Sequence, residues 1–208
     1  YIYEHENEYP DSLVQLALRN KETLTFVYDY KNNKDKEFSM KLIDDLKSDE
    51  IPLLLQWDER WGYKTYGDEY MAVNGCGPTC LSMVVSYLKQ NSSLHPYYIA
   101  EYAYKRGYLQ EAGTSWNLMT IGARDLGLKV EELPLEEGII KKNLELGRPI
   151  ICSVSKGIFT SSGHFIVLKE YKDGLIYVND PNSIEKSHQG YTFNQIQYQI
   201  KNLWAYNI

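Results

Sequence analysis

A change in hydrophobic periodicity partway along the chain constrains the fold most strongly. Leu81, Val84, Val85 and Leu88 recur at the spacing of one face of a helix, directly after Pro78. A proline suits the first turn of a helix, where its missing N–H does no harm. Further helical segments, each followed by a glycine, are expected at 96–106, 116–126 and 136–146.

The pattern turns β-rich after this helical stretch. Strands are expected at 149–155, 164–171, 175–178 and 202–206, and Thr192 can cap a short helix to about Ile200. Helices therefore come first and an antiparallel sheet second. This order predicts the α+β class.

Charge divides the chain into two parts. Residues 1–50 hold seven of the 22 basic and twelve of the 28 acidic side chains, so the remaining body is almost neutral. That body has no basic stripe for a phosphate backbone, and we expect no nucleic-acid partner. A short helix is expected at 11–20 and a weak polar helix at 41–50. We therefore expect an acidic, partly helical N-terminal extension of unknown role over 1–50 and the main domain over 51–208.

The apolar runs, the first residues and the cysteines of the sequence limit the classes of protein to which it can belong. No apolar run approaches the roughly 18 residues of a membrane span, so none is expected in this chain. The chain begins at Tyr1 without a targeting segment, and we interpret it as a mature or trimmed form. Three cysteines are too few for a disulfide scaffold. The oligomeric state is not indicated by the sequence.

Cys76 is the candidate nucleophile. It lies between Gly75 and Gly77 at the start of the expected helix. A helix N-terminus stabilises a thiolate, and flanking glycines permit a tight turn and a close approach of another segment. The alternative is a buried cysteine beside a turn. The sequence alone leaves the two interpretations about equally weighted.

The other two cysteines are expected in the core. Cys80 lies one helical turn after Cys76, which is a possible ligand spacing for zinc, but no second pair of ligands follows. Cys152 lies in an apolar strand. We therefore expect no metal and no cofactor.

His164 and Asp180 occupy the two strands of an expected hairpin. A two-residue turn at Asp173 and Gly174 would put them on opposite faces, because side chains alternate along a strand. A three-residue loop with left-handed Gly174 pairs Tyr171 with Leu175 and makes His164 and Asp180 diagonal neighbours on one face. We predict the three-residue loop. Asn179, the chemically similar rival, would then point away.

Gln56 is a candidate for contact with a substrate. It follows an apolar run, and its amide could donate to a developing oxyanion, or it could be a loop glutamine with local bonds.

Five ordered motifs together resemble a known family. They are Gln56 to Gly62, Asn74 to Thr79, Gly113 to Trp116, Gly163 to Val167 and Val178 to Pro181. The set resembles papain-like cysteine peptidases, and more closely the peptidase family thirty-nine-like domains, which are relatives of the double-glycine peptidases that process bacteriocin leaders. The resemblance covers about 51–206. It departs in the gap of twenty residues between Gln56 and Cys76, so double-glycine specificity is not carried over.

The resemblance implies a papain-like fold in which the helical part carries Cys76 and the sheet carries His164 and Asp180. It implies thiol-dependent hydrolysis of peptide bonds, with Gln56 in the oxyanion hole and Trp116 and Gly163 at the substrate. The alternative for Trp116 is a half-buried core aromatic. The resemblance also implies a peptide or protein substrate and a secreted or surface location in a Gram-positive bacterium. The alternatives are a catalytically idle module that binds peptide or cell-wall polymer, and an acyl transferase with the same triad.

Overall fold

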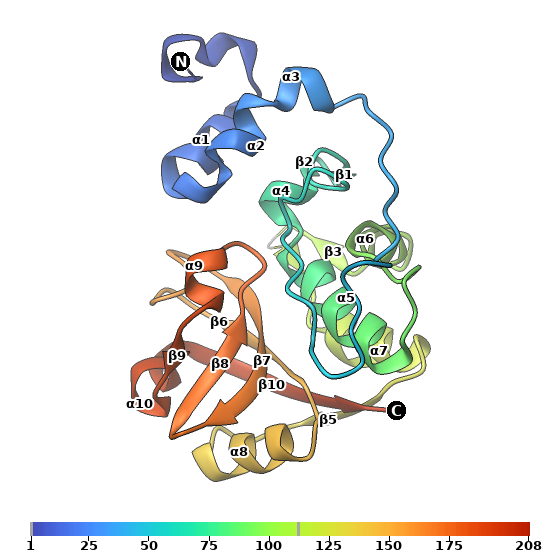
Figure 1. Ribbon diagram of the computed structural model, residues 1–208, viewed down its shortest axis with the longest axis vertical. Coiled ribbons are helices and arrows are strands. Elements are labelled where there is room, and N and C mark those ends of the chain that lie inside the picture. Colours follow the sequence, from blue (N-terminus) through green and yellow to red (C-terminus); the bar gives the residue numbers. More distant parts are fainter. Residues whose placement is uncertain (1, 112) are drawn as a thin grey trace.

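The structure, a computed structural model, describes residues 2–111 and 113–208 and places a helical part beside an antiparallel sheet (Figure 1). The sheet has six strands in the order β5-β10-β6-β7-β8-β9. Its strands are β5 (Lys129–Glu132), β6 (Ile150–Val154), β7 (His164–Lys172), β8 (Leu175–Asn179), β9 (Gly190–Tyr191) and β10 (Ile200–Asn207). Every pairing in this sheet is antiparallel. The predicted α+β class is confirmed, whereas β5 and β9 were not expected.

The helical part is built around one long buried helix. The helices of this part are α4 (Met71–Asn74), α5 (Cys76–Lys89), α6 (Pro96–Lys105) and α7 (Ala123–Asp125). Two small hairpins accompany them, β1 (Thr65–Tyr66) with β2 (Glu69–Tyr70) and β3 (Leu109–Gln110) with β4 (Gly113–Thr114). The helix expected at 116–126 is a π-helical turn, Leu118–Gly122, that continues into the short α7.

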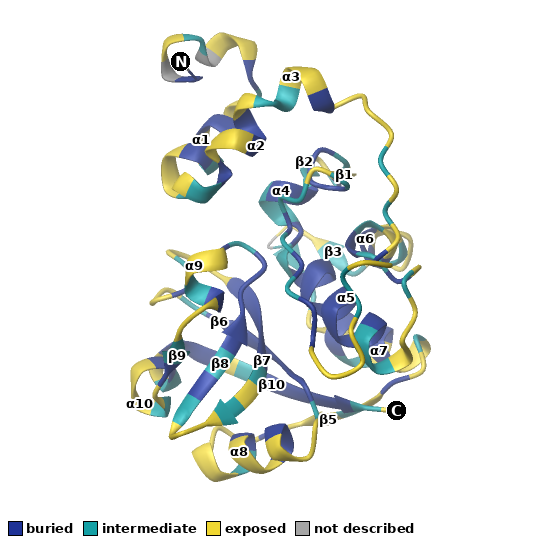
Figure 2. Cartoon of the chain, in the orientation of Figure 1, coloured by how far each residue is buried: buried dark blue, intermediate teal, exposed yellow. Residues whose placement is uncertain are grey.

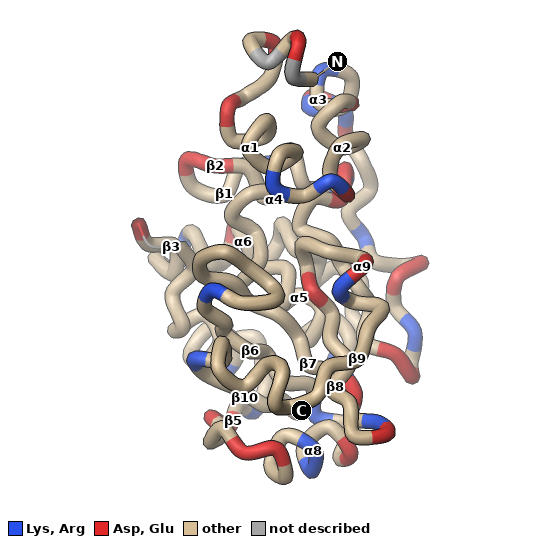
Figure 3. Tube along the Cα trace, turned by 90° about the vertical axis from the view of Figure 1, so that its left-hand side faces the viewer, with Lys and Arg blue, Asp and Glu red and all other residues tan. Residues whose placement is uncertain are grey.

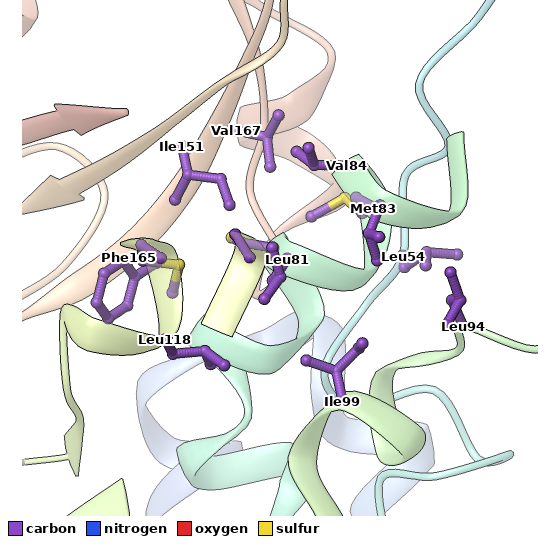
Figure 4. Packing of buried hydrophobic residues seen from close by; sticks show 14 of the residues in the cluster. Leu54, Leu81, Met83, Val84, Leu94, Ile99, Leu118, Ile151, Phe165 and Val167 are labelled. Carbon is purple, nitrogen blue, oxygen red and sulfur yellow. The ribbon is translucent and has the colours of Figure 1, made fainter. Parts of the chain in front are cut away.

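Helix α5 packs on one face of the sheet. Leu81 and Val84 of the helix share a core with Phe165 and Val167 of β7 (Figure 4). The alternate residues Ile166 and Leu168 lie in a second core, on the other face. Helix α8 (Glu137–Glu145) covers that face through apolar side chains, and the short α9 (Ile184–Ser187) and α10 (Phe193–Ile196) lie at its edge. The first half of β7, residues 164–168, is therefore buried from both sides, whereas its second half is partly exposed (Figure 2).

The β7–β8 hairpin corrects the predicted loop. Lys172 pairs with Leu175, so the turn has two residues, and both Asp173 (φ 52°) and Gly174 (φ 77°) are left-handed. The three-residue loop was wrong. Further along, a β-bulge at Lys169 shifts the register by one residue. Beyond the bulge Val167 pairs with Asn179, which is the register that the prediction gave for the site end of the hairpin.

The first fifty residues contain a helical segment followed by an extended connection. The helices are α1 (Asp11–Arg19), α2 (Leu24–Tyr28) and α3 (Tyr30–Asn33), with 3₁₀ turns at Ile2–Glu4, Glu6–Glu8 and Lys21–Thr23. They pack on the body through Tyr63, whose ring stacks on Phe26 at 4.2 Å and whose hydroxyl donates to the Phe26 carbonyl at 2.6 Å. The predicted helix at 41–50 is absent, and this stretch is joined to the body by the buried Leu42 and by the ion pair of Asp45 with Arg60.

Along the described residues Lys and Arg are interspersed with Asp and Glu (Figure 3). Among these residues no helix is both long and apolar enough to cross a membrane.

Candidate active site

Cys76 is the first residue of the 14-residue helix α5, and its side chain is partly exposed. The glycines on both sides are required by close contacts rather than by unusual φ angles. A Cβ on Gly75 would lie 2.4 Å from the Met71 carbonyl oxygen, and one on Gly77 would lie 2.8 Å from the Thr114 side chain. The backbone therefore packs tightly around a thiol at a positive helix end.

His164 is the first residue of β7 and lies against both partners that were expected for it. Its Nε2 is 2.7 Å from Oδ1 of Asp180, and both side chains are buried. Cys76 lies close enough to the same ring to contribute to its raised pKa, and both residues line one cleft. Because Asp180 occupies Nε2, Nδ1 is the nitrogen that is left for the thiol. The structure thus brings Cys76, His164 and Asp180 together.

The environment of His164 favours the charged imidazolium. Burial opposes the charge, but the Asp180 carboxylate and the contact with Cys76 outweigh it and raise the pKa of His164 above its ordinary value. By contrast, burial raises the pKa of the Cys80 and Cys152 thiols, which therefore remain protonated. Both lie in the core, as predicted.

Asp180 is held by its own loop. Its Oδ1 also accepts the backbone N–H of Asn182 at 2.8 Å, and its backbone N–H donates to Ser187 Oγ at 2.8 Å. Asn179 points elsewhere and donates to the carbonyls of Ile51 and Pro52, each at 3.0 Å. Because side chains alternate along β8, Asp180 faces His164, whereas Asn179 faces the segment that precedes Gln56.

Gln56 lies beside Cys76 but has local partners. Its amide nitrogen donates to the carbonyls of Ala72 at 2.7 Å and Val73 at 3.2 Å, and its Oε1 is buried without a partner. Its backbone N–H donates to the Pro181 carbonyl at 2.7 Å, which ties the Gln56 segment to the loop that follows Asp180.

A cleft of about 1040 Å³ opens over these residues. Gln56, Cys76 and His164 line it, together with the loop 156–163, so the predicted substrate residue Gly163 is at the cleft. Residues between Ser12 and Glu22 of the N-terminal extension also line it, which nothing in the motifs indicated.

Trp116 is outside the set of residues that line this cleft. Its indole is 46% exposed and stands edge-to-face on Trp204, with ring centroids 5.4 Å apart. The preceding Thr114 packs on Gly77, the residue that follows Cys76. The substrate role of Trp116 stays a prediction.

Cation ligands are not grouped in this region. Within 2–111 and 113–208 no three His, Cys, Asp or Glu side chains are placed to hold a metal ion.

Several solved structures are similar to this chain. The chain is similar to the peptidase domain of Streptococcus ComA, a bifunctional ABC transporter involved in a quorum-sensing pathway, at 20% identity and a TM-score of 0.45, over 64% of this chain and 89% of that one. It is also similar to a putative C39-like peptidase from Bacillus anthracis, at 16% identity and a TM-score of 0.49, over 76% and 94% of the two chains.

A third similar structure is a double glycine motif protease from an AMS/PCAT transporter in complex with the leader peptide, at 21% identity and a TM-score of 0.41, over 63% and 82% of the two chains. No curated protein matches the sequence. Residues 48–207, most of the 208-residue chain, match the Peptidase_C39 like family. The protein therefore belongs to the Peptidase_C39 like family.

Proposed function

We propose that this protein hydrolyses peptide bonds with Cys76 as nucleophile, His164 as base and Asp180 as the group that orients His164. The observation that carries the proposal is the buried contact between His164 Nε2 and Asp180 Oδ1, on a ring that lines the same cleft as Cys76. Membership of a peptidase family supports the same reaction class.

The proposed reaction begins with proton transfer from Cys76 Sγ to Nδ1 of His164. The thiolate then attacks the substrate carbonyl carbon, and the electron pair of the C=O bond moves to its oxygen. Collapse of this intermediate breaks the C–N bond, and His164 gives its proton to the leaving amine. A water molecule, deprotonated by His164, releases the acyl group from Cys76 and restores the thiol.

The oxyanion is expected to be stabilised by the backbone N–H of Cys76 and the side chain of Gln56. The Gln56 amide would give up its longer contact, 3.2 Å to the Val73 carbonyl, to donate to the oxyanion. Its shorter contact with Ala72 would then hold the amide in place.

The contacts of Gln56 also support a second candidate function, a peptide-binding module without catalysis. Both amide protons have carbonyl partners, so an oxyanion must compete with them. Such a module binds peptides in the same cleft and leaves them intact. The two candidates differ in the fate of a bound peptide.

Cleavage of a diverse peptide library, followed by mass spectrometry, tests the proposal. We expect cleaved products from the wild type and none from Cys76→Ala, while Cys152→Ala, a matched change at a buried thiol, keeps cleavage. Fragments that have gained water indicate hydrolysis, whereas fragments joined to an added amine indicate acyl transfer. Intact peptides that bind the wild type without cleavage would favour the binding module.

A further inference from the structure

The N-terminal extension is joined to the segment that follows Asp180 by the carboxylate of Glu22. This carboxylate accepts hydrogen bonds from Ser183 Oγ at 2.5 Å, from the Ile184 N–H at 2.7 Å and from the Glu185 N–H at 3.3 Å. In Figure 1, α9, which begins at Ile184, lies at the end of the sheet nearest to α1 of the extension. The partners are about 160 residues apart in the sequence.

Asn20 reinforces the same connection. Its side-chain nitrogen donates to the Asn182 carbonyl at 2.6 Å, and its side-chain oxygen accepts the Glu22 N–H at 3.0 Å. Trp57 Nε1 donates to the same Asn182 carbonyl at 3.2 Å. Residues 182–185 are therefore held from outside the sheet by two side chains of the extension.

The segment 182–185, which the extension contacts, also fixes the position of Asp180. The Asn182 N–H donates to Asp180 Oδ1, the same oxygen that meets His164. The Ser183 N–H donates to the Asp180 carbonyl at 3.2 Å. Asp180 Oδ2 is buried without a partner, so the carboxylate is oriented through Oδ1 and its loop alone. A displaced loop would therefore displace the atom that orients His164.

We propose that Glu22 is a positioning residue, which fixes the loop 180–183 and through it the Asp180 carboxylate against His164. The inference rests on the proposed function and extends it, because the extension lies largely outside the family match at 48–207. Glu22 and Asn20 of the N-terminal extension then help to position the catalytic groups, and residues between Ser12 and Glu22 contribute to the lining of the cleft.

The test compares Glu22→Ala with Glu22→Gln and a control on the same extension. In Glu22→Gln the amide oxygen still accepts the two backbone N–H groups and the amide nitrogen donates to Ser183 Oγ, so we expect rescue. The control is Glu8→Ala, which removes an exposed ion pair with Lys31, and neither residue lines the cleft. Thermal melting shows that each variant is folded.

Two readouts separate positioning from general stability. We expect kcat/KM of Glu22→Ala to fall by about ten- to a hundredfold, with Glu8→Ala unchanged. We also expect an NMR titration to show a lower pKa for the His164 ring in Glu22→Ala, because the Asp180 carboxylate is less well placed. If Glu22→Ala fails to fold, Asn20→Ala, which removes the contact with Asn182, takes its place in both measurements.

The outcomes distinguish this inference from the proposed function. Wild-type kcat/KM and a wild-type His164 titration in folded Glu22→Ala would overturn the positioning role alone. A lowered His164 pKa in a protein that cleaves no peptide would support the positioning of Asp180 and overturn the proposed peptidase activity.

Discussion

His164 Nε2 lies 2.7 Å from Asp180 Oδ1, and a β-bulge at Lys169 in the same hairpin makes this contact possible. The two-residue turn at the end of the hairpin would by itself put the two side chains on opposite faces. The extra residue of the bulge restores them to one face. The candidate site thus depends on a local irregularity in an otherwise regular ladder.

Substitutions at the end of β8 test which residue orients His164. Asp180→Ala should lower kcat/KM by about a hundredfold or more, because the imidazole loses its hydrogen bond and its preferred tautomer. Asp180→Asn should lower it less, since an amide oxygen still accepts the ring N–H. Turnover of a cleavable peptide by the purified variants measures both effects.

Asn179→Ala is the matched change one residue earlier. It should keep most of the activity but cost about 1–3 kcal/mol in the free energy of unfolding, because the buried carbonyls of Ile51 and Pro52 lose their donors. Urea denaturation measures the loss of stability. A folded Asn179→Ala variant that is less active than Asp180→Ala would show that the assigned triad is wrong.

Two glycines beside the candidate site should respond differently to a methyl group. Gly77→Ala puts Cβ 2.8 Å from Thr114 and should cost about 1–3 kcal/mol in the free energy of unfolding through overpacking. Gly163→Ala meets nothing within 4 Å and should change stability by less than about 0.5 kcal/mol. Equal unfolding midpoints in urea for the two variants would contradict the tight packing around Cys76.

The raised pKa of His164 predicts a dependence of stability on pH. A group whose pKa is higher in the folded than in the unfolded protein stabilises the fold when it is protonated. The contribution should be complete below the ordinary pKa of 6.5 and should decline as the pH rises toward the folded value of about 10. Urea denaturation of the wild type and His164→Gln across this range should show the wild type losing its relative advantage. A constant difference would contradict the raised pKa.

Local patterns predicted the elements that carry the site but not how they meet. The spacing of Leu81, Val84 and Val85 is enough to place a helix after Cys76, because one helix face must be buried. The prediction of a three-residue hairpin loop was wrong, because a two-residue turn together with the bulge at Lys169 produces the same register at His164.

No local sequence pattern could predict the long-range contacts of the N-terminal extension. The bonds of Glu22 to Ser183 and Ile184 join residues that are distant in sequence, and each residue is ordinary in its own segment. The helix predicted at 41–50 failed for a related reason. Tertiary anchoring of Leu42 on the body overrides a weak helical propensity.

Selective alkylation tests most directly the central claim, that Cys76 is the reactive thiol of this protein. Limiting iodoacetamide at about pH 6, where an ordinary thiol is almost fully protonated, should modify Cys76 first and leave Cys80 and Cys152 unmodified. Peptide mapping by mass spectrometry locates the adduct, and His164→Ala should slow its formation. Equal labelling of the three cysteines, or preferential labelling of Cys152, in the folded protein would contradict Cys76 as the nucleophile.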